Sequence, residues 1–173
     1  MTPLVKVPLT FGAVGGVLGA LVTIGLFYIG PHPFLVNYYA DYRVFLFGIF
    51  VFFVLKDIRD AKQGGVLYFW QGIVASFLFI TFFAIVASLL LALYGYLVPA
   101  FVNEYIRQSI EVLKKMPEDV IKGIGKDVYD RNLSVVPSTN NLDLAILYFA
   151  QCYMIGILIS IILSVILRRN PKP

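Results

Sequence analysis

Charged side chains are scarce in this sequence. Asp, Glu, Lys and Arg make up only 14% of the 173 residues, while apolar residues make up 60%. Soluble proteins average roughly 25% charged and 45 to 50% apolar residues, so the composition argues against an ordinary water-soluble domain. The net charge of +4 comes mostly from cations that flank apolar runs, where they anchor helices at a membrane interface rather than bind nucleic acid.

Cysteine and histidine are nearly absent. Cys152 is the single cysteine, which excludes an intrachain disulfide and a cysteine-built metal site. The single histidine, His32, stands between two prolines, and we predict that it lies at the surface of a loop. The sequence has no phosphate-binding loop, no HExxH motif and no Ser-His-Asp candidate set. We therefore expect neither an enzyme nor a bound cofactor.

Long apolar runs are what the sequence has instead. A helix needs about 20 apolar residues to cross a hydrocarbon core of about 30 Å. Four segments predict an all-α integral membrane protein, a bundle of four transmembrane helices at about residues 7–30, 35–56, 66–98 and 142–167. The second begins near residue 35 because its charge-free part, Val44 to Leu55, is too short to cross. The third is longer than a bilayer requires, so it should tilt or protrude.

Residues 100–141 form the only sizeable segment outside the predicted spans. Apolar residues recur there at helical spacing, while charged residues occupy the other faces; the apolar positions are Val102, Ile106, Ile110 and Leu113. This pattern predicts an amphipathic helix. Met116-Pro117 should end it, and a second short helix should follow.

Basic residues near the span ends predict the orientation. One side would carry Lys6, Lys56, Arg59, Lys62, Arg168, Arg169 and Lys172, whereas the opposite short loop would carry only Arg43. The positive-inside rule places the basic side in the cytoplasm. Both termini are then cytoplasmic, and residues 100–141 face outward.

Small residues at helical spacing predict the packing faces of the spans. Helices in lipid associate where small side chains let their backbones approach each other. The first span has two overlapping GxxxG motifs, and the third and fourth spans have matching small residues: Gly12, Gly15, Gly16, Gly19, Ala84, Ser88, Gly156 and Ser160. They predict contacts within the bundle; the alternative is a homodimer through the first span.

Arg43 is the charge that lies deepest in the predicted bundle. A charge below the membrane interface usually has a partner or a role. Its structural partner would be Asp143 or Asp41. Asp41 is only two positions away, so the two side chains would not face each other on a helix, and Asp143 in the last span is the favoured partner. The alternative is that Arg43, with Asp41 and Asp143 nearby, binds a lipid phosphate or an anionic solute.

The turn before the third span resembles that of a known family. Lys56-Asp57-Ile58-Arg59-Asp60, Gly64-Gly65 and Tyr68-Phe69-Trp70-Gln71-Gly72 look like the charged turn, glycine pair and aromatic-glutamine entry of a bacterial four-span membrane family, domain of unknown function 4199. The glycine-rich first span and the terminal Ile166-Leu167-Arg168-Arg169 are similar to it as well. The resemblance implies a bacterial inner membrane and brings no activity or catalytic residue.

Two classes of function fit these features. We expect a non-catalytic accessory or scaffold subunit that holds a partner protein through residues 100–141 or through the cytoplasmic turn, whose candidate residues are Lys56, Arg59, Lys62, Gly64 and Gly65. A membrane-associated glycosyltransferase could be that partner, although no residue selects it. The alternative is a small transporter or lipid-handling protein with a site near Arg43. We rank it lower because the spans show no buried polar path.

Overall fold

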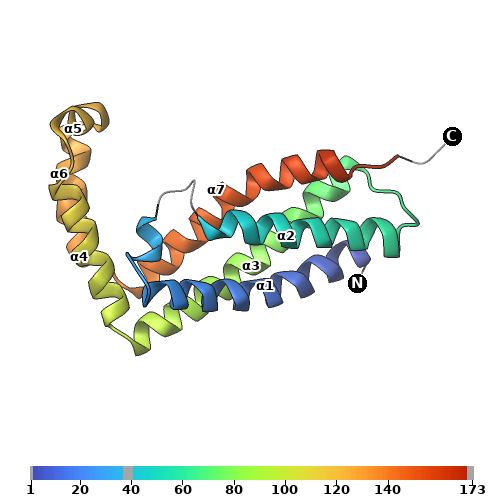
Figure 1. Cartoon of the computed structure of the whole chain (residues 1–173), viewed down its shortest axis with the longest axis horizontal. Helices are drawn as coiled ribbons and strands as arrows, with labels where there is room; N and C mark the ends of the chain where they lie inside the picture. The colour runs from blue at the N-terminus through green and yellow to red at the C-terminus, as the bar shows by residue number, and fades with distance from the viewer. Residues whose placement is uncertain (1, 37–40, 171–173) are drawn as a thin grey trace.

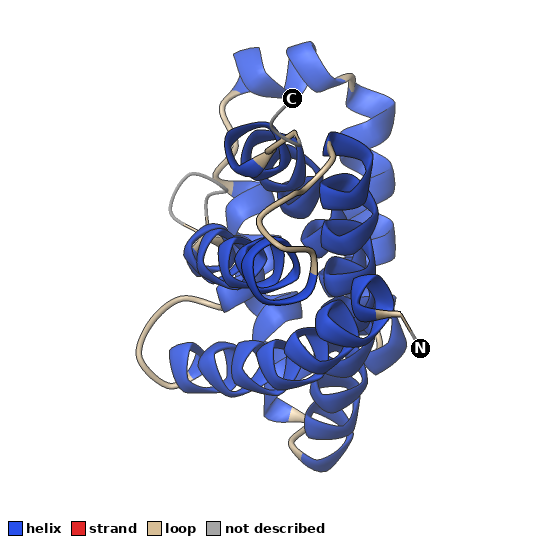
Figure 2. Ribbon diagram, turned by 90° about the vertical axis from the view of Figure 1, so that its right-hand side faces the viewer, coloured by secondary structure: helices blue, strands red, loops and turns tan. Residues whose placement is uncertain are grey.

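The computed structural model describes residues 2–36 and 41–170, and these residues form helices and connections without a β-strand. The long helices, which pack side by side (Figures 1 and 2), are α1 (Pro3–Phe27), α2 (Tyr42–Lys56), α3 (Phe69–Leu97) and α7 (Asn141–Leu167). The shorter ones are η1 (Pro33–Leu35), η3 (Asp57–Lys62), α4 (Ala100–Lys114), α5 (Glu118–Ile124), α6 (Lys126–Val135) and η4 (Val136–Ser138).

Three helices are long and apolar enough to cross a membrane, which indicates a membrane protein. They are α1, α3 and α7, with 25, 29 and 27 residues. The length of α3 corresponds to about 44 Å, close to the 40–45 Å of a bilayer that includes both headgroup regions. Trp70 and Tyr96 near its two ends are 58% and 74% exposed, as expected for aromatic side chains at the two membrane interfaces.

The second predicted span differs from expectation. Its helix α2 begins at Tyr42 and has 15 residues, about 22 Å of helix, although the π-helical η3 continues it. The helix begins at Tyr42 and not near residue 35, because Asp41 caps it. The Asp41 side chain accepts a hydrogen bond from the Arg43 backbone N–H. Residues 37–40 of this predicted span lie outside the described residues, as does Lys172 of the predicted basic side.

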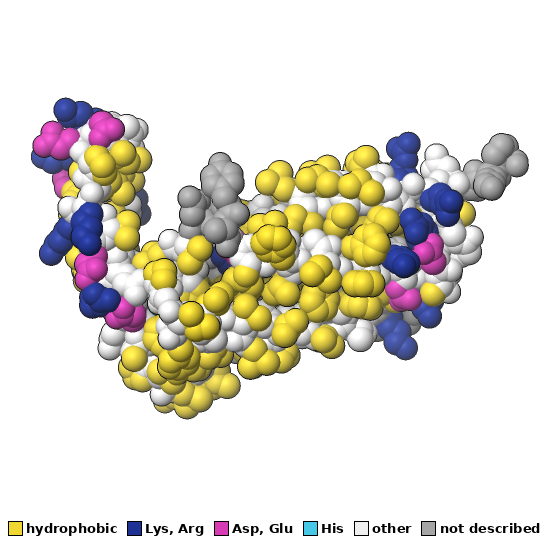
Figure 3. Space-filling view, viewed as in Figure 1, with side chains coloured by type: hydrophobic (Ala, Val, Ile, Leu, Met, Phe, Trp, Pro, Cys, Tyr) yellow, Lys and Arg dark blue, Asp and Glu magenta, His cyan; other side chains and the backbone are white. Residues whose placement is uncertain are grey.

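The directions of the helices follow from their contacts. α1 and α3 run parallel, since Gly12 lies against Phe79 and Gly16 lies against Phe83 further along both helices. α2 and α7 run in the opposite direction, so that α1 begins and α7 ends at the same end of the bundle (Figure 1). The exposed basic residues of this end are visible in Figure 3.

A helical arm leaves the opposite end of the bundle. We call residues 100–138, which comprise α4, α5, α6 and η4, the arm. It runs across the bundle axis and extends past the side of the bundle (Figure 1). The expected break at Met116-Pro117 is present, but the second half is two helices rather than one, because Gly125 between α5 and α6 adopts a φ of +93°.

The turn between α2 and α3 is closed against the end of α7. Gly64 and Gly65 both have positive φ angles, +61° and +90°, which a residue with a side chain rarely adopts. Leu67 and Arg169 then exchange two backbone hydrogen bonds of 2.9 Å. The turn is therefore fixed to the last helix rather than extended into solvent.

Candidate functional site

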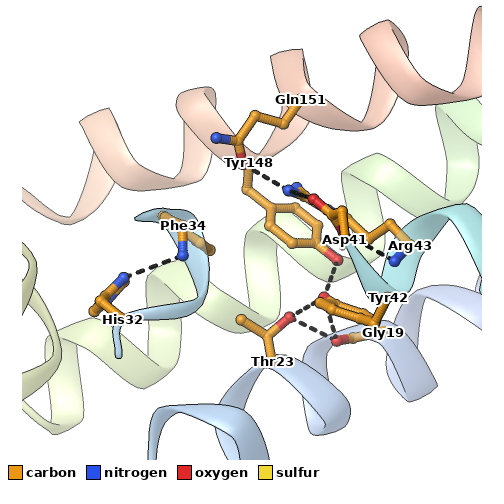
Figure 4. A network of polar contacts seen from close by, with 9 residues as sticks. All are labelled: Gly19, Thr23, His32, Phe34, Asp41, Tyr42, Arg43, Tyr148 and Gln151. Carbon is orange, nitrogen blue, oxygen red and sulfur yellow. Dashed lines mark hydrogen bonds and ion pairs between the residues drawn. The ribbon is translucent and has the colours of Figure 1, made fainter. Parts of the chain in front are cut away.

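Arg43 is held in a buried ion pair at the start of α2. Asp41 and Arg43 are 4% and 2% exposed. The Arg43 Nε donates to Asp41 Oδ1 and Oδ2 at 2.9 and 3.0 Å, and its Nη2 donates to Oδ2 as well. The same Nη2 also donates to Gln151 Oε1 on α7, at 2.9 Å (Figure 4). The charge of the guanidinium is thus compensated within the chain.

The expected pairing of Arg43 with Asp143 is wrong, and the reason is local. Asp41 is the residue that caps α2 and lies outside the helix, in extended conformation, so its side chain folds back over the first turn and reaches Arg43. The rule that residues two apart on a helix do not meet therefore does not apply. Asp143 instead accepts a hydrogen bond from the Asn140 backbone at 2.9 Å, in a capping box at the start of α7.

Hydroxyl groups extend this polar network to α1. The Tyr42 and Tyr148 hydroxyls are 3.1 Å apart, and the Tyr42 hydroxyl also bonds Thr23 and donates to the Gly19 carbonyl at 3.3 Å. The Arg43 guanidinium lies 4.9 Å from the centre of the Tyr148 ring, in a cation–π contact. One network therefore links α1, α2 and α7 (Figure 4). The sequence led us to expect no buried polar path in the spans, but the structure contains this buried polar cluster.

Two features of the cluster could serve a ligand. The Arg43 Nη1 is buried without a hydrogen-bond partner among the described residues, and the buried Cys152 lies near enough to Arg43 to interact with it electrostatically. A cavity of about 300 Å³ lies next to the ion pair, with Asp41 and Tyr42 on one wall and apolar residues on the others: Leu26, Ile29, Pro33 and Val36. Its polar wall consists of groups that already have partners.

The sequence carried a weak signal for this cluster. Gln151 is the only amide side chain within α7 after its first turn, and an isolated amide in an apolar helix needs a partner. Tyr42 and Tyr148 could not be recognised in the same way, because tyrosine is common near membrane interfaces.

Comparison with known families gives one result. Residues 10–169 match the family described as "Protein of unknown function (DUF4199)". The chain belongs to the DUF4199 family. The match confirms the resemblance carried by the charged turn and the aromatic entry to α3. No curated protein and no solved structure matches this DUF4199 protein.

The glycines of α1 in this DUF4199 protein lie against α3. A Cβ atom built on Gly12 would be 2.9 Å from the Phe79 carbonyl, and one on Gly16 would be 2.8 Å from the Phe83 carbonyl. A Cβ atom on Gly15 would be 3.0 Å from the Phe83 ring, and one on Gly19 would clash with the same ring. The glycine face that a homodimer through the first span would use is therefore covered within the chain.

The other predicted packing residues of the DUF4199 protein belong to α3 and α7. Gly156 faces the Ile80 side chain, and Ala84, Ser88 and Ser160 are buried. Gly72, which we did not assign to packing, lies against Ser164. Small residues thus let α3 approach both α1 and α7 closely.

The candidate partner-binding turn is exposed but internally paired. Arg59 donates to Asp60 at 2.6 Å, and the Lys56 ammonium lies 6.0 Å from the centre of the Phe52 ring. Lys62 is exposed at the end of η3. With Gly64, Gly65 and the acidic Asp57 and Asp60, these residues form a turn of mixed charge at the end opposite the arm.

His32 is not at the surface of a loop, which corrects the expectation from its neighbouring prolines. It is fully buried, and its ring centre lies 4.7 Å from that of Phe101 and 5.3 Å from that of Tyr105 on α4. Its backbone N–H donates to Gln108 Oε1 at 2.8 Å. Burial lowers the pKa of His32 to about 4, so the ring is neutral at pH 7. His32 and its aromatic neighbours join the base of the arm to the bundle.

Proposed function

We propose that this DUF4199 protein is a non-catalytic membrane accessory subunit that holds a partner protein through its arm. The supporting observation is the arm itself. It is attached to the bundle through buried aromatic contacts of His32, it extends past the side of the bundle, and its charged side chains lie at the surface (Figure 3). A projection attached through buried contacts suits docking, and the buried charges of the described bundle residues, Asp41 and Arg43, compensate each other.

We further propose that the chain crosses the membrane four times. Because α1 and α3 run parallel, the segment between them must return across the bilayer if both helices span it. This segment contains α2 and η3, which together extend from Tyr42 to Lys62. The loop with η1 would join α1 to this crossing at the arm end.

The basic end of the bundle supports an orientation with both termini in the cytoplasm of a bacterial inner membrane. Lys56, Arg59, Lys62, Arg168 and Arg169 belong to this end, and basic residues at span ends favour the cytoplasmic side. The arm would then face outward. A partner would dock on the outer surface of the membrane.

The arm is favoured over the cytoplasmic turn as the docking surface. In the turn Arg59 is paired with Asp60, and two backbone hydrogen bonds tie the turn to the end of α7. At the tip of the arm Lys115 and Lys122 are exposed, and no ion pair involves them among the described residues. The same is true of Lys56 and Lys62 in the turn, so the projection of the arm past the side of the bundle is what favours it (Figure 1). Free charges can pair with a partner at lower cost than charges that are already paired.

The test is affinity capture in mild detergent with identification of the co-purifying protein. The variant Lys115→Glu with Lys122→Glu should lose the partner, whereas Lys56→Glu with Lys62→Glu should retain it. Loss of the partner from the Lys56→Glu, Lys62→Glu variant alone would assign docking to the turn. Retention of every co-purifying protein by both variants would contradict the proposal.

A second candidate is a lipid-handling protein or small transporter, which the cavity beside Asp41 and Tyr42 favours. Native mass spectrometry of the purified protein would then detect a bound small molecule in stoichiometric amount. The variant Leu26→Trp fills part of the cavity and should release that molecule. A protein without such a ligand supports the accessory function instead.

A further inference from the structure

Two cavities of different chemistry share a wall at the turn after α1. The cavity of about 300 Å³ beside Asp41, which we call the apolar cavity, has mostly apolar walls, with Leu26 among them. The polar cavity, of about 430 Å³, lies along α4 and is lined by its charged residues Glu104, Arg107, Glu111 and Lys115. Gly30 and Pro31 line both cavities. The two cavities are therefore neighbours.

The two cavities lie at different depths relative to a membrane. Tyr28, directly after α1, is 70% exposed, as expected for a tyrosine in the interfacial region of a bilayer. Tyr42 on the wall of the apolar cavity bonds the Gly19 carbonyl, about two turns before the end of α1. The polar cavity is lined by α4, which follows the end of α3 and leads away from the bundle (Figure 1). Since α1 and α3 have the length and hydropathy to cross a bilayer, the apolar cavity lies toward the hydrocarbon core and the polar cavity lies toward water.

The polar cavity has two acidic and two basic residues, and one of each kind is available to a ligand. Arg107 pairs with Glu104 and Glu111, and Glu104 also accepts a hydrogen bond from Gln108. Among the described residues, Glu111 accepts a hydrogen bond through Oε1 only, and no ion pair involves Lys115. The Oε2 atom of Glu111 and the ammonium group of Lys115 can therefore bind a ligand.

Glu111 and Lys115 present opposite charges one helical turn apart. Residues four apart on a helix are neighbours on its surface, and both side chains are exposed. A carboxylate accepts hydrogen bonds from an ammonium group, and the lysine ammonium pairs with a phosphate. Phosphoethanolamine carries an ammonium group and a phosphate close together, so it complements both residues. An anionic headgroup would offer Glu111 no positive charge, and a choline group has no N–H to donate.

We propose that the two cavities together bind one phospholipid with a phosphoethanolamine headgroup. The headgroup lies between Glu111 and Lys115, and part of one acyl chain occupies the apolar cavity beside Leu26. The cavity volumes lie in the range of about 300–1,000 Å³ that is typical of ligand sites. The inference rests on the second candidate function, whose ligand it names, and it requires no partner on the arm.

Native mass spectrometry of the full-length chain, purified in detergent and freed of lipid, tests the headgroup. The protein is incubated with an equimolar mixture of phosphatidylethanolamine, phosphatidylcholine and phosphatidylglycerol that carry the same acyl chains. One phosphatidylethanolamine per chain should bind, several-fold in excess of the other two lipids. Glu111→Gln should abolish the preference over phosphatidylglycerol. Glu118→Gln, the matched control in α5 outside the polar cavity, should retain it.

Two variants of α1 test the acyl chain. Leu26→Trp fills part of the apolar cavity and should lower phosphatidylethanolamine binding several-fold. Leu21→Trp, the control, changes a residue of the same helix that is 60% exposed and does not line the cavity, and it should leave binding unchanged. Soluble phosphoethanolamine at the concentration of the lipid should not displace the lipid, because the headgroup alone makes no contact with the apolar cavity.

Equal binding of the three lipids, or an unchanged preference in Glu111→Gln, would overturn the proposal, because the charged residues would then not select the headgroup. Displacement by phosphoethanolamine, or unchanged binding in Leu26→Trp, would overturn it as well, since the apolar cavity would then hold no acyl chain. A different ligand that Leu26→Trp releases would overturn this inference but retain the second candidate function. The absence of any bound lipid would overturn both.

Discussion

At the scale of single residues, the burial of Arg43 is explained by a partner that the same turn supplies. A buried charge is costly unless an opposite charge and hydrogen bonds compensate it. Asp41 supplies the opposite charge, and Gln151 on α7 accepts a further hydrogen bond from Arg43. Asp41 also caps α2. The start of the helix and the compensation of its charge therefore depend on one carboxylate.

This arrangement predicts a thermodynamic coupling between Asp41 and Arg43. Arg43→Gln and Asp41→Asn should each lower the free energy of unfolding in detergent by about 3 kcal/mol or more, because each leaves a buried charge unpaired. Asn preserves the cap, so the effect of Asp41→Asn reports the charge. The double variant should cost less than the sum of the two. The control Asp143→Asn should change the stability by under about 1 kcal/mol. The effects of Arg43→Gln and Asp143→Asn should simply add, because these two residues do not contact each other.

His32 predicts a pH dependence of arm docking. Its pKa is about 4 in the buried site against an ordinary value of 6.5. An undocked His32 takes up a proton as the pH falls through 6.5, whereas the buried ring stays neutral until about pH 4, so docking weakens over this window. Between pH 7 and pH 5 the loss should be about 2 kcal/mol. Hydrogen bonds from Arg107 hold the pKa of Glu104 near 2, so this carboxylate does not titrate there.

Hydrogen exchange of the first turns of α4 measures this effect. After correction for intrinsic rates, exchange should be faster at pH 5 than at pH 7 in the parent protein. The variant His32→Phe keeps an aromatic side chain but removes the titrating group, and its exchange should be the same at both values. A parent protein without pH dependence would show that His32 is not buried when the arm is docked.

At the scale of helices, the sequence predicted the apolar elements better than their ends. α1, α3 and α7 lie where long apolar runs predict them, because a helix is the conformation that satisfies a backbone in lipid. The start of α2 could not be found in this way. It depends on the capping side chain of Asp41 and on the prolines of the preceding loop, which interrupt a segment whose hydropathy alone suggests continuity.

The candidate site was predictable only in part, for a related reason. The sequence pointed to Arg43 because a charge in an apolar segment stands out, but the identity of its partner depends on whether Asp41 is inside or outside the helix. The enclosure of His32 depends on Phe101 and Tyr105, which are distant in sequence and are brought there by the turn after α3. Tertiary contacts of this kind leave no local pattern.

The close approach of α1 and α3 predicts opposite effects for two glycines of the same helix. In Gly16→Ala the new Cβ would meet the Phe83 carbonyl and the Val86 side chain at 2.8 Å, so overpacking should cost about 1–3 kcal/mol. Gly25 has nothing within 4 Å of its Cβ position, and Gly25→Ala should leave the stability unchanged or raise it by up to about 1 kcal/mol. Thermal unfolding in detergent compares the two. Equal melting temperatures would argue against the α1–α3 contact.

At the scale of the whole molecule, the parallel course of α1 and α3 bears on the proposed crossing by α2. Two parallel spans that follow each other in sequence require a return between them, even if the returning helix is shorter than the hydrocarbon core. The loop with η1 and the ion pair of Asp41 and Arg43 precede α2, and Figure 4 shows the buried polar contacts of this pair. The length of α2 is therefore compatible with a crossing.

Labelling of single cysteines tests the crossing directly. Gly30 precedes η1 at the arm end and Lys62 ends η3 at the basic end; both are exposed, and Cys152, the native cysteine, is replaced by serine. In intact cells an impermeant thiol reagent should label Gly30→Cys and Lys122→Cys but not Lys62→Cys, which should react only after the membrane is permeabilised. Labelling of Gly30→Cys and Lys62→Cys from one side would show that α2 does not cross. Labelling of Lys62→Cys alone would reverse the orientation while it preserves the crossing, because the basic end would then face outward and the arm would face the cytoplasm.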